Sequence, residues 1–252
     1  MKLSFIGNGA MAKAMIKGAI ANYKIEVIGR DLEKLNILNE ELNGKLEVKK
    51  LEEKMDVEGK VLILCVKPQA LKSVATFFKG RAKALISVLA GTNLSSLKEQ
   101  IKADFTIRAM PNLAASYKAS MTTLTGDKGF KEESMLILQS IGKTLWLESE
   151  KELDIAAGVN GCGPAFLAIV AEALADGAVK EGVKREDAYV LVKGLFEGFA
   201  PLLENSTHPA LIKDGVMSPG GVTAAGVGAL EEFRVRNAFI KAIQYAHEKK
   251  IK

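Results

Sequence analysis

The chain has few residues of the kinds that build metal centres, disulfide frameworks or hydrolytic triads. Its 252 residues include only 2 cysteines and 2 histidines. Cys65 and Cys162 lie far apart without a CxxC spacing, which fits a reducing compartment and indicates no disulfide framework. Neither His208 nor His247 has a cysteine or carboxylate at metal-ligand spacing. We therefore expect no metal site and no Ser-His-Asp mechanism.

Long uncharged apolar runs and charge of one sign are also lacking. The first apolar stretch is too short for a signal peptide, and the apolar segment at residues 165–178 is interrupted by Glu172 and Asp176. The net charge of +5 comes from 35 basic and 30 acidic residues scattered along the chain, a pattern typical of a solvated surface. We expect a cytoplasmic protein with no membrane span and no nucleic-acid partner.

What the sequence does have is a glycine turn directly after its first apolar run. Residues 2–6 predict a strand, and residues 7–12 follow with the pattern G-x-G-x-x-A. In a βαβ unit the first glycine makes the tight turn, the second admits a pyrophosphate, and the small third residue allows close helix packing. A predicted helix at residues 10–21 and a strand at residues 25–28 complete the unit. The pattern predicts a dinucleotide held at a helix N-terminus.

The end of the second predicted strand carries Arg30, followed by Asp31. Folds of this type that select NAD place an acid here for the ribose 2′-hydroxyl, whereas an arginine accommodates the 2′-phosphate of NADP. Because Arg30 comes first, we predict NADP, with NADPH as donor and NAD as a second cofactor. The alternative is that Arg30 only closes the loop and Asp31 caps a helix over residues 32–42.

The chain changes character in its middle. Up to residue 148 predicted strands and helices alternate, with strands at residues 60–66, 84–89, 105–109, 121–125 and 144–147. From residue 149 on, helical periodicity takes over, with a break near Phe233 in the last helix. The predicted fold is α/β: a Rossmann-type doubly wound sheet in residues 1–148, then an all-α dimerisation domain in residues 149–252. The helices carry apolar residues on several faces, which favours a homodimer.

Two glycine-rich joints precede helices in the second half, at residues 158–164 and 218–223. Each offers free N–H groups for a carboxylate or phosphate, or else permits close helix crossing. The first joint matches the glycines of hydroxyacid dehydrogenases, but Leu167 and Ala171 stand where those enzymes have lysine and asparagine. That departure argues against carbonyl reduction. A cyclic iminium ion already carries its proton and accepts hydride with no strong acid beside it.

Several motifs together make the chain resemble the pyrroline-5-carboxylate reductases over essentially its whole length. They are F-I-G-N-G-A-M-A at the start, V-K-P-Q at residues 66–69, A-G-T at 90–92, R-A-M-P-N at 108–112, G-C-G-P-A-F at 161–166 and K-D-G-V-M-S-P-G-G-V-T at 213–223. The last motif is the most specific. The resemblance implies NAD(P)H-dependent reduction of (S)-1-pyrroline-5-carboxylate to L-proline, the last step of proline synthesis.

By the same resemblance, the cofactor should contact Ile6, Gly7, Asn8, Gly9, Ala10, Met11, Arg30, Val66, Lys67, Pro68, Gln69, Ala90, Gly91 and Thr92. The backbone of Gly220, Gly221, Val222 and Thr223 should receive the substrate carboxylate, and the Thr223 hydroxyl, taken as the catalytic group, should bond the ring nitrogen. Glu150 stands where relatives have an acid near the ring. Family members use interlocked helical domains of two subunits, often within larger rings.

This sequence departs from the family at Cys162, Phe166 and Val222, where Ser, Tyr and Thr are usual, and these changes remove hydroxyl groups. A reductase of a six-membered cyclic imine remains an alternative, because no residue excludes the larger ring. An NADP-binding sensor without turnover is a second alternative. A purely structural dimerisation module would leave the glycine turn without a role.

Overall fold

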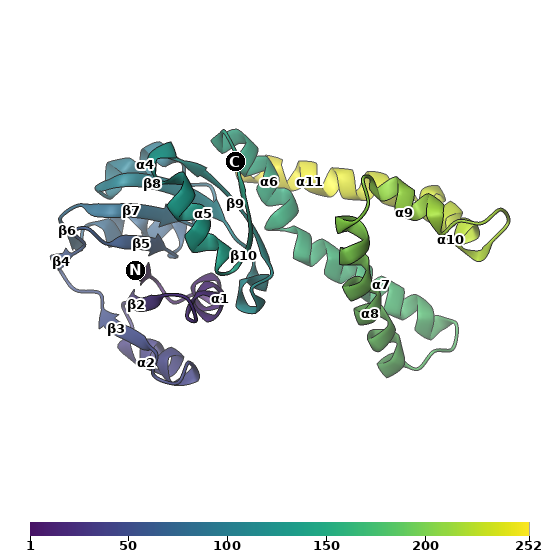
Figure 1. The fold of residues 1–252 in the computed structure, drawn as a ribbon, viewed down its shortest axis with the longest axis horizontal. Coiled ribbons are helices and arrows are strands. Elements are labelled where there is room, and N and C mark those ends of the chain that lie inside the picture. The colour runs from purple at the N-terminus through teal and green to yellow at the C-terminus, as the bar shows by residue number, and fades with distance from the viewer. Residues whose placement is uncertain (252) are drawn as a thin grey trace. The chain divides into compact units, whose positions relative to one another are not determined.

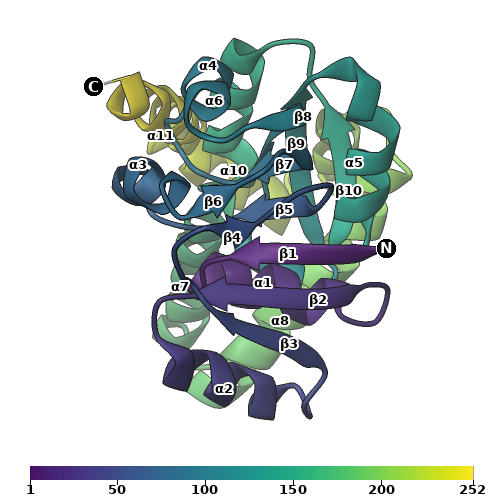
Figure 2. The same cartoon turned by 90° about the vertical axis from the view of Figure 1, so that its left-hand side faces the viewer.

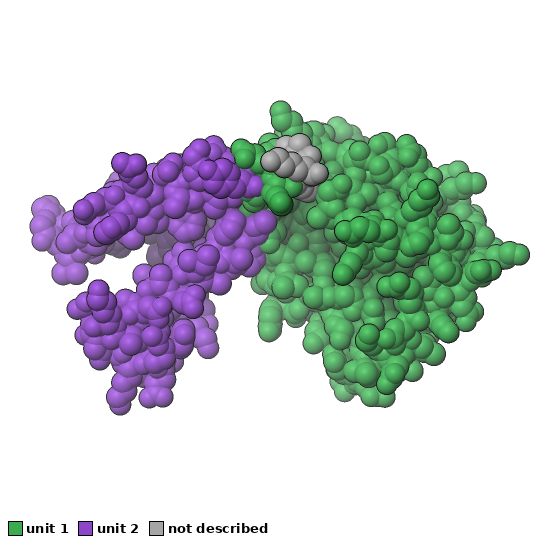
Figure 3. All heavy atoms as spheres, turned by 180° about the vertical axis from the view of Figure 1, so that it is seen from behind, with its two compact units in different colours: residues 1–161, 246–252 green, residues 162–245 purple. Residues whose placement is uncertain are grey.

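The computed structural model describes residues 1–251, with side chains up to Lys249. The chain forms two compact units, one of residues 1–161 together with the described residues from Ala246 on, the other of residues 162–245 (Figure 3). Helix α6 (Glu150–Asn160) packs against strands β8 (Ala103–Met110) and β9 (Ser120–Gly126) of the first unit. The division after residue 148 stays a prediction, and the two units are described separately below.

The first unit is built on one large sheet of eight strands in the order β10-β9-β8-β7-β5-β1-β2-β3 (Figures 1 and 2). Neighbouring strands are parallel except for β8 and β9. The strands are β1 (Lys2–Ile6), β2 (Lys24–Gly29), β3 (Leu46–Lys50), β5 (Val61–Leu64), β7 (Ala82–Ser87), β8 (Ala103–Met110), β9 (Ser120–Gly126) and β10 (Gly142–Trp146).

Helices cover both faces of this sheet. One face packs on α1 (Ala10–Ala19), α2 (Leu32–Glu41) and α5 (Lys131–Gln139), and the other packs on α3 (Leu71–Ala75) and α4 (Leu94–Gln100). Alternate strand residues enter the two cores, as Phe5 and Ile6 do on β1. Strands buried on both faces need nearly continuous apolar sequence, and β5 reads VLIL. The predicted doubly wound, largely parallel sheet is confirmed.

The strand order reverses at β1. The chain passes from β1 to β2 on one side, and β5 later pairs with β1 on the other side. In open α/β sheets, ligands bind outside the carboxyl ends of the strands at such a reversal. The glycine turn after β1 therefore lies where the topology places a ligand.

Strand β3 and the small two-stranded sheet of β4 (Met55–Asp56) and β6 (Phe78–Lys79) were not predicted from the sequence. Strand β3 reads LEVKK, with three charged residues among five. It lies at the edge of the sheet, where only one neighbour pairs with it. Edge strands carry charged side chains that hide their periodicity and discourage pairing with other chains.

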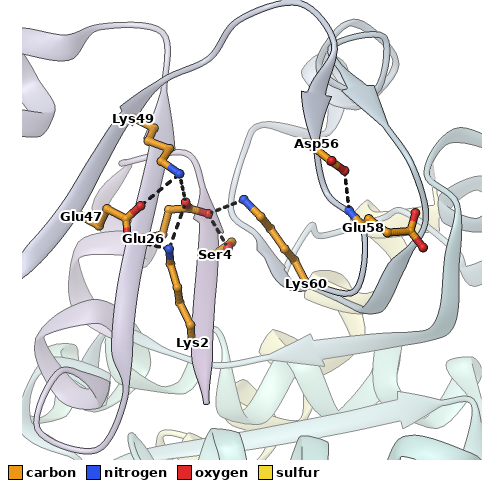
Figure 4. A network of polar contacts seen from close by, with 8 residues as sticks. All are labelled: Lys2, Ser4, Glu26, Glu47, Lys49, Asp56, Glu58 and Lys60. Atoms are coloured by element: carbon orange, nitrogen blue, oxygen red, sulfur yellow. Dashed lines mark hydrogen bonds and ion pairs between the residues drawn. The ribbon is translucent and has the colours of Figure 1, made fainter.

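A buried carboxylate interrupts the sheet face that carries Ile6 and Ile28. The Glu26 side chain, on β2, is 0% exposed and lies among polar side chains from neighbouring segments (Figure 4). Its Oε2 accepts hydrogen bonds from Ser4 Oγ at 2.6 Å and Lys60 Nζ at 2.9 Å. Its Oε1 lies 2.7 Å from Lys49 Nζ and 3.4 Å from Lys2 Nζ. Burial tends to raise the pKa of Glu26, but hydrogen bonds from Lys49, Ser4 and Lys60 outweigh it and lower the pKa to about 2.

The second unit is helical, as predicted. It comprises α7 (Gly163–Lys180), α8 (Arg185–Glu204), α9 (Pro209–Gly215), α10 (Val222–Glu232) and most of α11 (Val235–Ile251). The predicted break near Phe233 is confirmed, since Arg234 has φ +55° between α10 and α11. The buried core is small, formed by Ala175, Ala188 and Val192. Many large apolar side chains are exposed instead: Leu167, Ile169, Leu174, Val190, Leu191, Leu195, Leu211, Leu230, Phe233 and Ile240.

Candidate functional site

The turn after β1 depends on the two glycines in different ways. Gly7 has φ +105°, and a Cβ there would lie 2.7 Å from the backbone oxygen of Cys65. Gly9 has an ordinary φ of −69°, caps α1 without a side-chain hydrogen bond, and would meet nothing within 4 Å if it carried a Cβ. Gly7 is therefore required by the fold. Gly9 leaves open space before the N-terminus of α1, where the free N–H groups favour an anion.

A pocket of about 270 Å³ opens beside this turn, between the ends of β1, β2 and β5. Seven of the predicted cofactor residues line it: Ile6, Gly7, Asn8, Gly9, Arg30, Val66 and Lys67. The sequence did not predict Ile28, Gly29, Leu51, Cys65, Ala70 and Val74, which complete the lining. The remaining predicted contacts lie next to the turn or on later loops and do not line this pocket: Ala10, Met11, Pro68, Gln69, Ala90, Gly91 and Thr92.

The charges around the pocket favour a phosphate. Arg30 and Lys67 both line it, and both are exposed. The neighbouring acid is engaged elsewhere, since Asp31 caps α2 by accepting from the Lys34 amide at 3.1 Å and pairs with Lys34 Nζ. The hydrogen bond from the Lys34 amide lowers the pKa of Asp31. The capping role that was the alternative for Asp31 is thus observed together with an Arg30 that faces the pocket.

Cys65 lines the pocket and packs against the core on the side of the sheet that carries Phe5 and Met15. Burial raises the pKa of Cys65 well above its ordinary value. A thiol that stays protonated is a poor nucleophile. Cys65 therefore contributes shape and an apolar surface.

Residues 90–92 follow β7 and lead into α4. Gly91 has φ +68°, and Thr92 is buried. Asn93 then caps α4, its Oδ1 accepting from the Ser96 amide at 2.8 Å. This loop lies at the carboxyl end of β7, two strands from β1 in the sheet order.

Glu150 lies at the start of α6 and is only partly exposed. Its Oε1 accepts from Arg108 Nη1 at 2.6 Å and from the Leu94 amide at 2.9 Å. Arg108, in β8, has a side chain that is 1% exposed, and its Nη2 donates to Asp154 Oδ1 at 2.7 Å. The sequence did not predict this group. The arginine within the apolar segment FTIRAM could have indicated this group, because a buried charged side chain needs a partner of opposite charge.

The C-terminal end of α6 is also held by polar contacts. Asn160 Nδ2 donates to the backbone oxygens of Met110 and Met121, and Asn112 Nδ2 donates to the backbone oxygen of Asn160 at 2.9 Å. Both asparagines are buried. The R-A-M-P-N motif therefore anchors both ends of α6, through Arg108 at one end and Met110 and Asn112 at the other.

The glycine joint before α10 lies in the second unit. Gly220 has φ +69°, and the Gly221 amide donates to the Ser218 backbone oxygen at 3.0 Å. Gly221 caps α10 without a side-chain hydrogen bond, and a Cβ there would lie 2.3 Å from Ser218 Oγ. Val222 is 93% exposed and Thr223 is also exposed. The first amides of the 11-residue helix α10 therefore have no partner within the helix and no side-chain cap, and the exposed Thr223 carries a hydroxyl in the same turn.

Among the described residues, no group of three or more His, Cys, Asp and Glu side chains is placed to hold a metal ion. One helical stretch in the described part of the chain, residues 150–180, is long and apolar enough to cross a membrane by length and composition. This stretch is divided between α6 and α7, which end at Asn160 and begin at Gly163 respectively.

Comparison with known proteins identifies the family. A pyrroline-5-carboxylate reductase dimerisation model matches residues 150–252, and a model described as NADP oxidoreductase, coenzyme F420-dependent, matches residues 2–91. A pyrroline-5-carboxylate reductase of Synechocystis is 35% identical over 262 residues, covering 99% of this chain and 97% of the relative. The chain belongs to the pyrroline-5-carboxylate reductase family. It is an NADP-dependent oxidoreductase of proline biosynthesis.

Solved structures agree with this assignment of the reductase. The pyrroline-5-carboxylate reductase of Streptococcus pyogenes is 30% identical with a TM-score of 0.84, covering 99% of this chain and 98% of the other. The Plasmodium falciparum enzyme, whose structure has NADP bound, is 28% identical with a TM-score of 0.80 and the same coverage. The exposed apolar helices of the reductase thus lie in a segment matched to a dimerisation domain.

Proposed function

We propose that this reductase binds NADPH along the turn at residues 6–11 and reduces (S)-1-pyrroline-5-carboxylate to L-proline at the nicotinamide end. The observation that carries the cofactor part is the pocket at the strand reversal. There the open N-terminus of α1 and the side chains of Arg30 and Lys67 offer three separate attractions for phosphate groups. The nicotinamide end then extends toward residues 90–92.

Hydride transfer to a cyclic iminium ion needs few catalytic side chains. Bound NADPH supplies the hydride. The carbon of the C=N double bond receives the hydride, and the electron pair of the π bond moves to nitrogen. The positively charged iminium nitrogen thereby becomes a neutral ring amine. No proton donor is needed in this step, so the residues of the chain orient the ring and exclude water. We assign no general acid to the site.

The joint before α10 supplies the substrate contacts in this proposal. The N–H groups of Gly220, Val222 and Thr223 receive the carboxylate, because the start of α10 has free donors and a positive dipole end. The Gly221 N–H already donates to the Ser218 backbone oxygen, so Gly221 shapes the turn that presents the other donors. The Thr223 hydroxyl accepts a hydrogen bond from the iminium N–H and can donate one to the amine that forms. A valine at position 222 leaves the backbone donor intact.

The functional unit in this proposal is a homodimer in the cytoplasm, built through the helical unit, with rings of dimers as a further level. The support is the exposed apolar surface on α7, α8 and α10, which the small core of that unit leaves uncovered. Mass measurement by light scattering tests the dimer and the ring separately.

The deciding experiment follows NADPH absorbance with pyrroline-5-carboxylate and with its six-membered homologue, each repeated with NADH. We expect turnover of the five-membered ring and faster turnover with NADPH. Turnover of the six-membered homologue alone would show that the substrate is the six-membered cyclic imine. Tight NADPH binding without turnover of either imine would favour the sensor.

A further inference from the structure

Three segments that are distant in the sequence meet at the Glu150 carboxylate. Helix α6 carries Glu150 in its first turn, β8 contributes Arg108, and the start of α4 contributes the Leu94 amide. The first turn of α6 is fixed by a capping box, in which Ser149 Oγ accepts from the Glu152 amide and the Glu152 carboxylate accepts from the Ser149 amide. The direction of the Glu150 side chain is therefore set by its own helix.

The contact with Leu94 bears on the cofactor loop. Leu94 is the first residue of α4, two positions after Thr92. The first amides of a helix have no partner within the helix, and the Asn93 side chain satisfies that of Ser96. Glu150 Oε1 satisfies that of Leu94 at 2.9 Å. The carboxylate thereby ties the end of the loop at residues 90–92 to the body of the sheet.

The contact with Arg108 holds the carboxylate in place. The guanidinium is almost fully buried and binds both Glu150 and Asp154, which lie one turn apart on the same face of α6. If Glu150 turned away toward a substrate ring, the Leu94 amide would lose its acceptor and Arg108 would lose one of two charged partners. Both losses disfavour that movement, because a buried donor without an acceptor is destabilising.

We infer that Glu150 is a positioning residue for the cofactor loop at residues 90–92, and is not a ligand of the substrate ring. The inference rests on the cofactor site proposed above. It replaces the role that resemblance implied for Glu150, and it makes Arg108 the group that holds the positioning carboxylate. NADPH affinity should depend on the length of the Glu150 side chain, because that length decides whether Oε1 can accept the hydrogen bond from the Leu94 amide.

Two substitutions of Glu150 separate the effect of side-chain length from the effect of charge. Glu150→Asp keeps the charge beside Arg108 but is one methylene too short for the Leu94 amide. Glu150→Gln keeps the reach and an acceptor oxygen but loses the charge. We expect E150D to weaken NADPH binding by about tenfold, as loss of one charge-assisted hydrogen bond implies, and E150Q to stay within about threefold of wild type. The KM for the imine should change less than about twofold in both variants.

The measurements are NADPH affinity by titration without substrate, then kcat and KM for the imine at saturating NADPH. Glu152→Gln is the matched control, since this residue lies in the same turn of α6 and contacts neither Leu94 nor Arg108. Unfolding followed by Trp146 fluorescence verifies that the variants are folded.

The outcomes are distinct. Normal NADPH affinity in E150D would overturn the inference. A raised imine KM in E150Q with unchanged NADPH affinity would also overturn it, because a carboxylate near a cationic ring acts through its charge. Gly91→Val tests the site on which the inference rests: if E150D and Gly91→Val both leave NADPH affinity unchanged, the proposed cofactor loop is wrong as well.

Discussion

The buried carboxylate of Glu26 gives a stability prediction whose size follows from the structure. Its pKa falls from 4.5 in a free side chain to about 2 in the folded protein, which corresponds to about 3 kcal/mol of stability. The three lysines around it are 27–43% exposed, so solvent screens part of the attraction. We expect Glu26→Gln to lower the free energy of unfolding by about 2 kcal/mol at neutral pH.

The same shift fixes the pH dependence. A carboxyl whose pKa is lower in the folded state stabilises the protein above the unfolded pKa, and it loses that contribution as pH falls through the folded pKa. For Glu26 the loss should occur between about pH 4.5 and about pH 2. The difference between wild type and Glu26→Gln should therefore be fully present at neutral pH and should shrink toward zero near pH 2.

Urea unfolding followed by Trp146 fluorescence measures this difference, because the chain has 1 tryptophan and it lies on β10 of the same sheet. Glu47→Gln is the control, since Glu47 pairs with Lys2 and Lys49 but is 49% exposed and should contribute less than about 1 kcal/mol. An equal difference at neutral pH and near pH 2 would refute the reasoning, as would equal effects of Glu26→Gln and Glu47→Gln.

Four further substitutions test the site and the turn that forms it. Arg30→Ala should weaken NADPH binding by about tenfold or more with little effect on NADH, and an equal loss in the two affinities would remove Arg30 from the 2′-phosphate. Thr223→Ala should lower kcat/KM for the imine by roughly tenfold and leave NADPH affinity unchanged; wild-type kinetics would remove Thr223 from the site. Gly7→Ala should lower stability itself, since its Cβ would lie 2.7 Å from a backbone oxygen. Gly9→Ala should leave stability unchanged and weaken NADPH binding. Thermal unfolding and NADPH titration measure the two effects, and a destabilised Gly9→Ala variant with normal NADPH affinity would contradict the proposed role of Gly9.

The sequence predicted the glycine turn that lines the pocket because the determinants of this turn are visible in the local sequence. A strand, a glycine turn and a helix start follow one another within residues 2–19, and the G-x-G-x-x-A pattern of the turn occupies residues 7–12. Arg30 was predicted for the same reason, since it follows directly on β2. The helical nature of the second half also follows from local periodicity.

Residues that reach the site through tertiary packing were not predicted. Leu51 lines the pocket because β3 pairs with β2 and ends beside Gly29, as the Leu51 amide donating to the Gly29 oxygen shows. The charged sequence of β3 hid that strand. Val74 lines the pocket from α3, and only the packing of α3 against the sheet brings it there. Neither residue carries a motif.

Glu150 has a role implied by the resemblance and a set of contacts that the sequence did not predict. The resemblance implies an acid near the substrate ring, and that role stays a prediction, to which the positioning role inferred above is the alternative. The physical constraint lies in another segment: Arg108 stands in an apolar strand, so it must find carboxylates when the sheet is covered. Glu150 and Asp154, four residues apart at the start of the next long helix, present two of them on one face. The buried guanidinium of Arg108 therefore predicts its pairing with these two carboxylates. The hydrogen bond from the Leu94 amide to Glu150 then connects the ion pairs to the loop at residues 90–92.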